Sequence, residues 1–224
     1  MSTPQPILVL DLDGTLVDTA SDLVATLNAI LGEEGLPPVE LRQALTMVGH
    51  GARAMLAKAF GEQADEARLD ALMPRFIDHY AGHLADTSRP FPGAPESLDR
   101  FAASGWRLAV CTNKLEGLSR SLLEQLGLAD RFAAIAGQDT FAVRKPDPGH
   151  LTRTIDLAGG DARRAVMVGD SEVDVKTARA AGIPVVAVTF GYSPLPAHEL
   201  GADVVIDRYD ALYDAAVSLV DRPR

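Results

Sequence analysis

Short, uninterrupted runs of apolar residues recur along this chain, and a polar or glycine-containing turn follows each of them. The runs cover residues 7–10, 108–111, 133–136, 165–168, 185–188 and 204–206. Apolar runs this short are typical of strands that are buried on both faces of a parallel sheet. Helical patterns separate most of the runs, so the sequence predicts a doubly wound, Rossmann-like α/β sheet.

The helices predicted between the later strands have recognisable ends. Patterns over residues 94–104, 115–126 and 173–181 stop at Gly105, Gly127 and Gly182, and glycine just past a helix suits the left-handed C-terminal cap. Asp147 followed by Pro148 is typical of an N-cap residue and a proline at the first helical position.

An all-helical block interrupts this alternation between the first and second predicted strands. Its patterns cover residues 19–31, 40–47, 52–60 and 65–85, and we find no strand-like run among them. We therefore expect two domains, a catalytic core of residues 1–17 and 92–224 and an inserted helical cap of residues 18–91. The junctions near 17–18 and 90–93 are candidate hinges.

Composition limits the class of protein. Hydrophobic residues make up 47% of the chain, enough for a sizeable core, and the one cysteine, Cys111, excludes an internal disulfide. The sequence has neither a secretory signal pattern nor an apolar run of membrane-spanning length, so we expect a cytoplasmic protein with no membrane partner. A net charge of −10 disfavours nucleic acid, and an anionic substrate would need a local cationic site. Monomer and homodimer both stay open.

The first polar cluster directly follows the first predicted strand. It reads Asp11-Leu12-Asp13-Gly14-Thr15. An isolated Asp-Gly pair is most often a tight turn, but two carboxylates at the end of a buried strand also suit chemistry. A carboxylate can attack phosphorus when a cation screens the like charges, and a second carboxyl can protonate the leaving oxygen.

Two further clusters would supply hydrogen-bond donors and a cation. Thr112 and Asn113 follow the second predicted strand and open a predicted helix, which suits either a phosphate site or an ordinary N-cap. Lys145, fixed by Pro146, can place a point charge on a phosphoryl group or can be an ordinary solvated loop lysine. Cys111 has no evident base, so we interpret it as a buried strand-end residue.

The fourth cluster carries two more carboxylates. Asp170 ends a predicted strand, and Asp174 falls in the first turn of the next helix. Hard oxygen ligands of this kind suit Mg²⁺, although the same residues can cap the helix and complement its dipole. Open α/β sheets bind ligands at the carboxyl ends of their strands, so the joint position of the four clusters indicates one active site.

These residues, in this order, resemble the four motifs of the haloacid dehalogenase superfamily, and the resemblance covers essentially the whole chain. It implies a Mg²⁺-dependent enzyme with Asp11 as nucleophile and metal ligand, and with Asp13 as general acid/base that also offers its backbone carbonyl to the metal. It implies further that Thr112 and Asn113 hold phosphoryl oxygens, that Lys145 balances charge, and that Asp170 and Asp174 support the metal. The second aspartate, Asp13, favours phosphoryl transfer over carbon–halogen hydrolysis.

Within the superfamily the chain looks most like the phosphoglycolate phosphatase group, on residues 48–52, 113–114 and 189–192. We therefore expect hydrolysis of a small phosphorylated metabolite, with 2-phosphoglycolate as the expected substrate. His50, with Arg53 nearby, is a candidate for the substrate carboxylate, and an exposed helix–helix turn is the alternative. His79 and His83 have metal-ligand spacing, but a solvated helix face is the better interpretation.

Several alternatives stay open at this stage. Sugar phosphates, pyrophosphate and a phosphomutase reaction of the β-phosphoglucomutase type would use the same core residues. A catalytically silent binding module is a remote alternative, because Asp11, Asp13 and Asp170 are all present.

Overall fold

The computed structural model describes residues 5–48 and 51–221. A six-stranded sheet forms its core, with the order β5-β4-β1-β6-β7-β8, and every pairing in it is parallel. The strands are β1 (Ile7–Leu10), β4 (Arg107–Cys111), β5 (Ala134–Ala136), β6 (Ala165–Gly169), β7 (Val185–Val188) and β8 (Val204–Ile206). All six apolar runs are therefore strands, and the prediction of a parallel α/β sheet is confirmed.

Alternation along each strand divides the apolar residues between two layers. Leu8 and Leu10 of β1 belong to one buried cluster, and Ile7 and Val9 belong to the other. The first cluster is covered by α5 (Ala94–Ala103), α6 (Glu116–Gln125) and α9 (Leu212–Val220). The second is covered by α7 (Pro148–Leu157) and α8 (Glu172–Ala180). Burial on both faces explains why β1, β5, β6 and β7 are continuously apolar, whereas Val205 of the edge strand β8 is exposed.

The helix ends follow the local chemistry of the sequence. Gly105, Gly127 and Gly182 have φ values of +77°, +67° and +68°, the left-handed region expected of a glycine past a helix. Asp147 is the N-cap of α7, and its side chain accepts a hydrogen bond from the Gly149 amide at 2.7 Å. Five 3₁₀ turns complete the element order: η1 (Gly61–Gln63), η2 (Ala129–Arg131), η3 (Ala162–Arg164), η4 (Ala197–Glu199) and η5 (Tyr209–Ala211).

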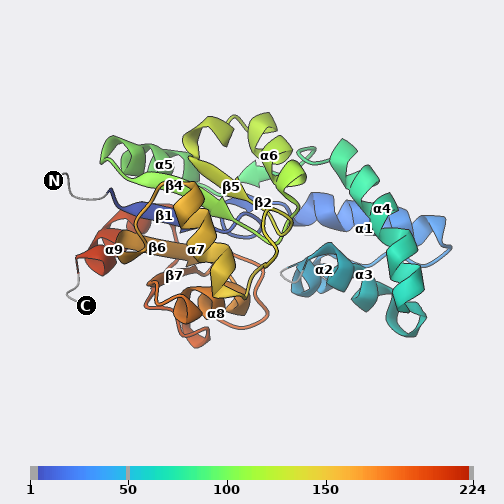
Figure 1. Ribbon diagram of the computed structural model, residues 1–224. Coiled ribbons are helices and arrows are strands. Elements are labelled where there is room, and N and C mark those ends of the chain that lie inside the picture. Colours follow the sequence, from blue (N-terminus) through green and yellow to red (C-terminus); the bar gives the residue numbers. More distant parts are fainter. Residues whose placement is uncertain (1–4, 49–50, 222–224) are drawn as a thin grey trace.

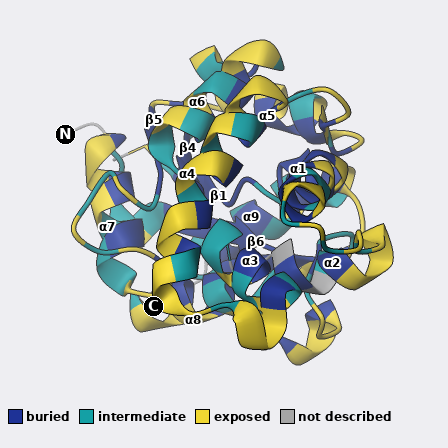
Figure 2. Cartoon of the chain, turned by 90° about the vertical axis from the view of Figure 1, so that its right-hand side faces the viewer, coloured by how far each residue is buried: buried dark blue, intermediate teal, exposed yellow. Residues whose placement is uncertain are grey.

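Four helices lie together beside the carboxyl end of the sheet, at the right of Figure 1. They are α1 (Ala20–Glu33), α2 (Leu41–Val48), α3 (Ala52–Phe60) and α4 (Glu66–Gly82). Their apolar side chains join the same buried cluster as one face of the sheet. Figure 2 views the molecule from this side, with exposed residues on the outer surfaces of the helices and the buried strands behind them. The expected Rossmann-like core with a helical cap is confirmed, while the boundaries at 18 and 91 stay a prediction.

A two-stranded antiparallel ribbon joins the helical block to the core. This ribbon was not predicted from the sequence. The ribbon pairs β2 (Val17–Asp18) with β3 (Arg89–Pro90). Each of these strands has only two residues, which is too short to show a hydrophobic period in the sequence. The expectation of no strand within residues 18–91 was therefore wrong at this point. Both candidate hinges therefore lie in one hydrogen-bonded ribbon.

None of the described helices combines the length and the apolar character that crossing a membrane requires.

Candidate active site

The four polar clusters meet at the carboxyl edge of the sheet. Asp11 follows β1, Thr112 follows β4 and Asp170 follows β6, and these three strands are neighbours. Lys145 reaches the same place from the loop between β5 and α7. The predicted convergence at one edge of the sheet agrees with the geometry.

Lys145 is a buried cation between two carboxylates. Its Nζ lies 2.9 Å from Asp11 Oδ1 and 2.6 Å from Asp174 Oδ1, and its side chain is 2% exposed. Burial alone would lower the pKa of Lys145, but Asp11 and Asp174 raise it above its ordinary value, so the charge is kept. The interpretation of Lys145 as a solvated loop lysine is wrong.

Asp11 stays available as a carboxylate despite its burial. Burial raises its pKa to about 6, an effect that Lys145 opposes and that the Asp174 charge reinforces. Its Oδ1 also accepts the Leu12 amide at 2.7 Å. At neutral pH the side chain is therefore predominantly ionised, as a nucleophile or a metal ligand requires.

Asp170 and Asp174 complete a cluster of three buried carboxylates with Asp11. One oxygen from each can be chosen so that all three lie within 4.8 Å of one another. Burial, followed by repulsion from Asp174 and Asp11, raises the pKa of Asp170 to about 8. Lys145 is in contact with only two of the three, so the cluster has an excess of negative charge. Hard, anionic oxygen donors with uncompensated charge fit a divalent cation such as Mg²⁺.

Surrounding groups hold these two carboxylates in place. Asp170 accepts hydrogen bonds from the Tyr192 amide at 2.7 Å and from Thr15 Oγ1 at 3.1 Å. Asp174 accepts the Ser171 hydroxyl at 2.6 Å and belongs to the capping box of α8. The alternative that Asp170 caps this helix is wrong, because Ser171 is the N-cap.

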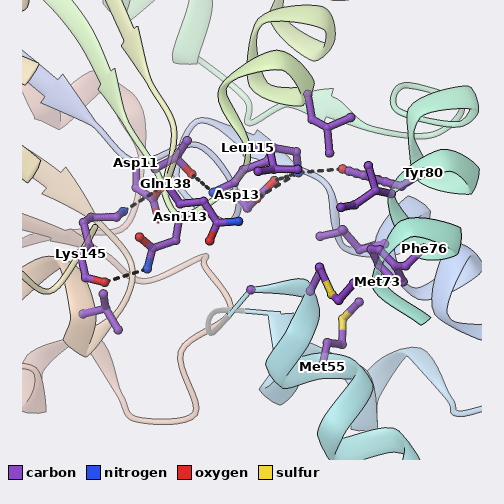
Figure 3. Close-up of a pocket in the computed structure, with 18 of the residues that line it drawn as sticks. Asp11, Asp13, Met55, Met73, Phe76, Tyr80, Asn113, Leu115, Gln138 and Lys145 are labelled. Atoms are coloured by element: carbon purple, nitrogen blue, oxygen red, sulfur yellow. Dashed lines mark hydrogen bonds and ion pairs between the residues drawn. The ribbon is translucent and has the colours of Figure 1, made fainter. Parts of the chain in front are cut away.

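Asp13 lies in a second charged pair, between the core and the helical block (Figure 3). Lys114 Nζ lies 2.8 and 3.1 Å from its two oxygens, and Thr19 donates its hydroxyl to Oδ1 at 2.8 Å. The same Nζ donates to the Tyr80 hydroxyl of α4 at 2.9 Å. A cation from the core and a phenol from the cap therefore meet beside this carboxylate.

Thr112 and Asn113 precede α6 and do not cap it. The N-cap of α6 is Leu115, which has no side-chain cap bond, so the N-cap interpretation of these residues is wrong. Thr112 Oγ1 accepts the Lys114 amide at 3.2 Å. The Asn113 amide donates to the Lys145 carbonyl at 3.1 Å, and this bond ties the loop after β4 to the loop that carries Lys145.

A cavity of about 70 Å³ opens among these side chains, several times the volume that one water molecule needs. Asp11, Asp13, Thr112, Asn113 and Lys145 line it from the core. Figure 3 shows Met55, Met73, Phe76 and Tyr80 facing it from the helical block. The cavity thus has a charged end and an apolar end.

Arg53 and His50 are the two remaining residues that were predicted to bind substrate. Arg53 pairs with Glu66 and Asp70 at the surface, with its side chain 40% exposed, and is not among the residues that line the cavity. His50 lies outside the described residues. Substrate contact by Arg53 and His50 therefore stays a prediction.

Cys111 is a buried strand-end residue, as expected, and the two cap histidines contact each other and neighbouring side chains. Cys111 is fully buried beside His150, and burial raises the pKa of its thiol to about 12, so it is no nucleophile. His79 stacks on His83, and they contact Thr26 and Asp86 respectively. Neither histidine belongs to a metal-binding group among the described residues.

Four residues around the site were not predicted from the sequence: Lys114, Tyr80, Thr19 and Tyr192. Lys114 and Tyr192 lay within stretches noted for their resemblance, but their partners were not evident. The Lys114–Asp13 contact spans 101 positions and the Lys114–Tyr80 contact spans 34. A helix pattern places Tyr80 on a buried face but does not indicate its partner.

Comparison with known proteins gives one consistent result. A model of the family described as haloacid dehalogenase-like hydrolase matches residues 8–188. A Mesorhizobium japonicum protein named phosphoglycolate phosphatase is 52% identical over 97% of this chain and 96% of its own length. A protein of that name from Agrobacterium fabrum is 50% identical over 94% and 91% of the two chains.

Solved structures include close relatives of the fold. The crystal structure of a protein from Haemophilus somnus, described as a predicted phosphoglycolate phosphatase, has a TM-score of 0.86 with 27% identity. The match covers 96% of this chain and 99% of that one, so it includes the helical block as well as the sheet.

Proposed function

The chain belongs to the haloacid dehalogenase-like hydrolase family, and from this premise we propose that it hydrolyses 2-phosphoglycolate to glycolate and phosphate through a phospho-aspartyl intermediate on Asp11. The family and its relatives make it a phosphoric monoester hydrolase. The substrate and the intermediate are our proposal.

One observation supports this mechanism above the others. Asp11 and Asp13 line the same cavity, and each is in contact with its own lysine, Lys145 and Lys114 respectively. Two adjacent carboxylates in separate electrostatic environments suit two separate roles.

In the first half-reaction, an Asp11 carboxylate oxygen attacks phosphorus, and the bond from phosphorus to the alcohol oxygen breaks. A protonated Asp13 donates its proton to that oxygen, so a neutral alcohol leaves. Lys145 balances the charge on Asp11 and on the transferring group. Following the family resemblance, Thr112 and Asn113 hold the phosphoryl oxygens.

In the second half-reaction, Asp13 takes a proton from water while the water oxygen attacks phosphorus. The bond between phosphorus and Asp11 breaks, which releases phosphate and restores both carboxyl groups. Asp13 thus serves as acid and then as base, as expected of a group that faces both the leaving alcohol and the incoming water.

Asp11, Asp170 and Asp174 would hold Mg²⁺, with the backbone carbonyl of Asp13 as a further ligand. When bound, the ion would neutralise charge on the phosphoryl oxygens as a Lewis acid. The cluster of three carboxylates within 4.8 Å supports this assignment.

We further propose that residues 18–91 act as a cap that excludes water during the reaction. The two connections through β2 and β3 would serve as its hinge, and the apolar cavity wall would cover the substrate.

The test compares Asp11→Asn with wild type in phosphate release under Mg²⁺. We expect activity to fall by about 10⁴-fold or more, because removal of a nucleophile abolishes the covalent route. Asp156→Asn, an exposed aspartate on α7, is the matched control and should keep wild-type activity. Full activity in Asp11→Asn contradicts the mechanism.

A substrate panel tests the assignment of 2-phosphoglycolate separately. It compares kcat/KM for 2-phosphoglycolate, sugar phosphates and pyrophosphate, with product analysis for hexose 1-phosphates. If several sugar phosphates rank above 2-phosphoglycolate, the substrate is wrong while the reaction class stands.

A further inference from the structure

The cap side of the active-site cavity offers a leaving group almost no polar contact. Its described cap residues include Leu23, Met55, Met73, Phe76 and Ile77, all apolar. The Tyr80 hydroxyl is the exception among the described cap residues, and it already accepts a hydrogen bond from Lys114. A polar group placed against these apolar side chains loses water and regains no partner from them. The Tyr80 O–H and the backbone at Gly51 and Ala52, where α3 begins, are the polar groups that the described cap residues offer.

Lys114 stands at the border between the apolar end and the charged end. Its Nζ reaches Asp13 at 2.8 Å and the Tyr80 hydroxyl at 2.9 Å, and it lies 4.5 Å from the Tyr80 ring centroid. The two Asp13 oxygens and the Tyr80 hydroxyl accept all three N–H donors of this ammonium, so a ligand carboxylate would take the place of one of these acceptors. Lys114 lines the cavity although its side chain is only 4% exposed.

The other cationic groups near the site pair with carboxylates away from the leaving alcohol. Lys145 contacts Asp11 and Asp174, on the side of the attacking oxygen. Arg53 pairs with Glu66 and Asp70 at the surface. Among the described residues lining the cavity, Lys114 is thus the cation on the side of the leaving alcohol.

We propose that Lys114 binds a carboxylate carried by the leaving alcohol, so that the site selects phosphomonoesters of small hydroxy acids over those of neutral alcohols and polyols. This inference rests on the proposed function and specifies its substrate recognition. It assigns the carboxylate to a core lysine after β4, rather than to His50 or Arg53 of the cap.

The position of Lys114 also limits the length of the substrate. Its Nζ touches Asp13, the group assigned to protonate the leaving oxygen, so a carboxylate bound by Lys114 lies close to that oxygen along the substrate chain. A two-carbon hydroxy acid fits this separation. Longer polyols would instead place hydroxyl groups against Met55, Met73 and Phe76, where unpaired hydroxyls are unfavourable.

The first experiment uses wild-type enzyme and esters matched in size. 2-Phosphoglycolate is compared with 2-phosphoglycolamide, its neutral isostere, and propyl phosphate with glycerol 1-phosphate, which adds two hydroxyls. A charged hydrogen bond predicts that kcat/KM for 2-phosphoglycolate exceeds that for the amide by about 10- to 100-fold. Propyl phosphate should exceed glycerol 1-phosphate. Equal values within the first pair overturn the assignment of a carboxylate receptor.

The second experiment assigns the preference to Lys114. In Lys114→Met and Lys114→Gln the acid-to-amide ratio should fall to within about threefold of one, because both variants lack the cation. Lys176→Met, which removes an exposed lysine of α8, should keep the wild-type ratio. The ratio is informative because displacement of Asp13 would slow both esters alike. A wild-type ratio in both Lys114 variants refutes the inference.

A binding measurement covers the case in which the Lys114 variants turn over too slowly to assay. Calorimetry compares the acid and the amide on Asp11→Asn and on Asp11→Asn/Lys114→Met, neither of which needs turnover. The second protein should lose the preference for the acid, and retention of it refutes the role of Lys114. If wild type hydrolyses no phosphomonoester at all, it is the proposed function that fails.

Discussion

Replacement of Lys145 by methionine should destabilise the protein in a manner that depends on pH. The lysine lies 2.9 Å from Asp11 and 2.6 Å from Asp174 and is almost fully buried. Methionine fills a similar volume but leaves Asp11 and Asp174 without their shared cation. Removal of one partner from a buried ion pair costs about 3–5 kcal/mol when the remaining charge cannot reach water.

Protonation limits this cost at low pH. Asp11 and Asp170 have folded pKa values raised to about 6 and about 8, above the ordinary value of 3.8. The folded state therefore binds more protons than the unfolded state between pH 3.8 and about 8, and stability falls as pH rises through that window. Lys145 opposes the rise in the Asp11 pKa, so its loss raises that pKa further and the penalty grows with pH.

Urea unfolding in EDTA at pH 8 and pH 5 measures the effect. We expect Lys145→Met to lose about 3 kcal/mol at pH 8 and about 1 kcal/mol at pH 5 relative to wild type. Lys176→Met removes an exposed lysine paired with Glu172 and should cost less than about 0.5 kcal/mol at either pH. An equal loss at both pH values, or a loss below about 1 kcal/mol at pH 8, refutes the assignment of Lys145 as the buried counter-ion.

Two further predictions concern the hinge and a buried histidine. Asp22 is 3% exposed and accepts hydrogen bonds from the hydroxyls and the amides of Thr87 and Ser88, which together outweigh burial and lower its pKa. Asp22→Ala should therefore cost about 3 kcal/mol in urea unfolding, and a cost below about 1 kcal/mol excludes Asp22 as the tie between α1 and the segment before β3. Burial lowers the pKa of His150 to about 4, so the unfolded state binds more protons between pH 4 and 6.5, and His150 should remove about 1–2 kcal/mol as pH falls from 7 to 5. The raised pKa values of Asp11 and Asp170 change stability in the opposite direction over this pH range. The dependence of the unfolding free energy on pH is therefore compared between wild type and His150→Leu, and an identical dependence contradicts this role of His150.

The strands, most helix ends and the four polar clusters could be predicted because each depends on local sequence. Apolar runs of three or four residues indicate strands buried in a parallel sheet, and a polar residue directly after such a strand must lie at the carboxyl edge of the sheet. Asp11, Thr112 and Asp170 are predicted in this way, whereas Lys145 lies in the loop between β5 and α7 and was predicted from the proline that follows it.

The cap side of the site could not be predicted in the same way. Its contacts join residues from separate elements, such as Lys114 after β4 and Tyr80 of α4, and helical periodicity indicates a buried face but not the group across from it. Arg53 shows that closeness in sequence can also suggest a contact that the structure does not contain. Its proximity in sequence to His50 suggested a shared ligand, but Glu66 and Asp70 of α4 hold its guanidinium at the surface.

The most direct measurement of the central claim is covalent capture of phosphate on Asp11. Asp13→Asn is mixed with radiolabelled p-nitrophenyl phosphate, whose leaving group needs no acid, and the reaction is quenched in acid. We expect the label on the peptide that contains Asp11, because an enzyme without Asp13 forms the acyl phosphate but hydrolyses it slowly. Asp11→Asn should carry no label. Turnover of p-nitrophenyl phosphate with no label on Asp13→Asn, or label on a different residue, contradicts Asp11 as the nucleophile.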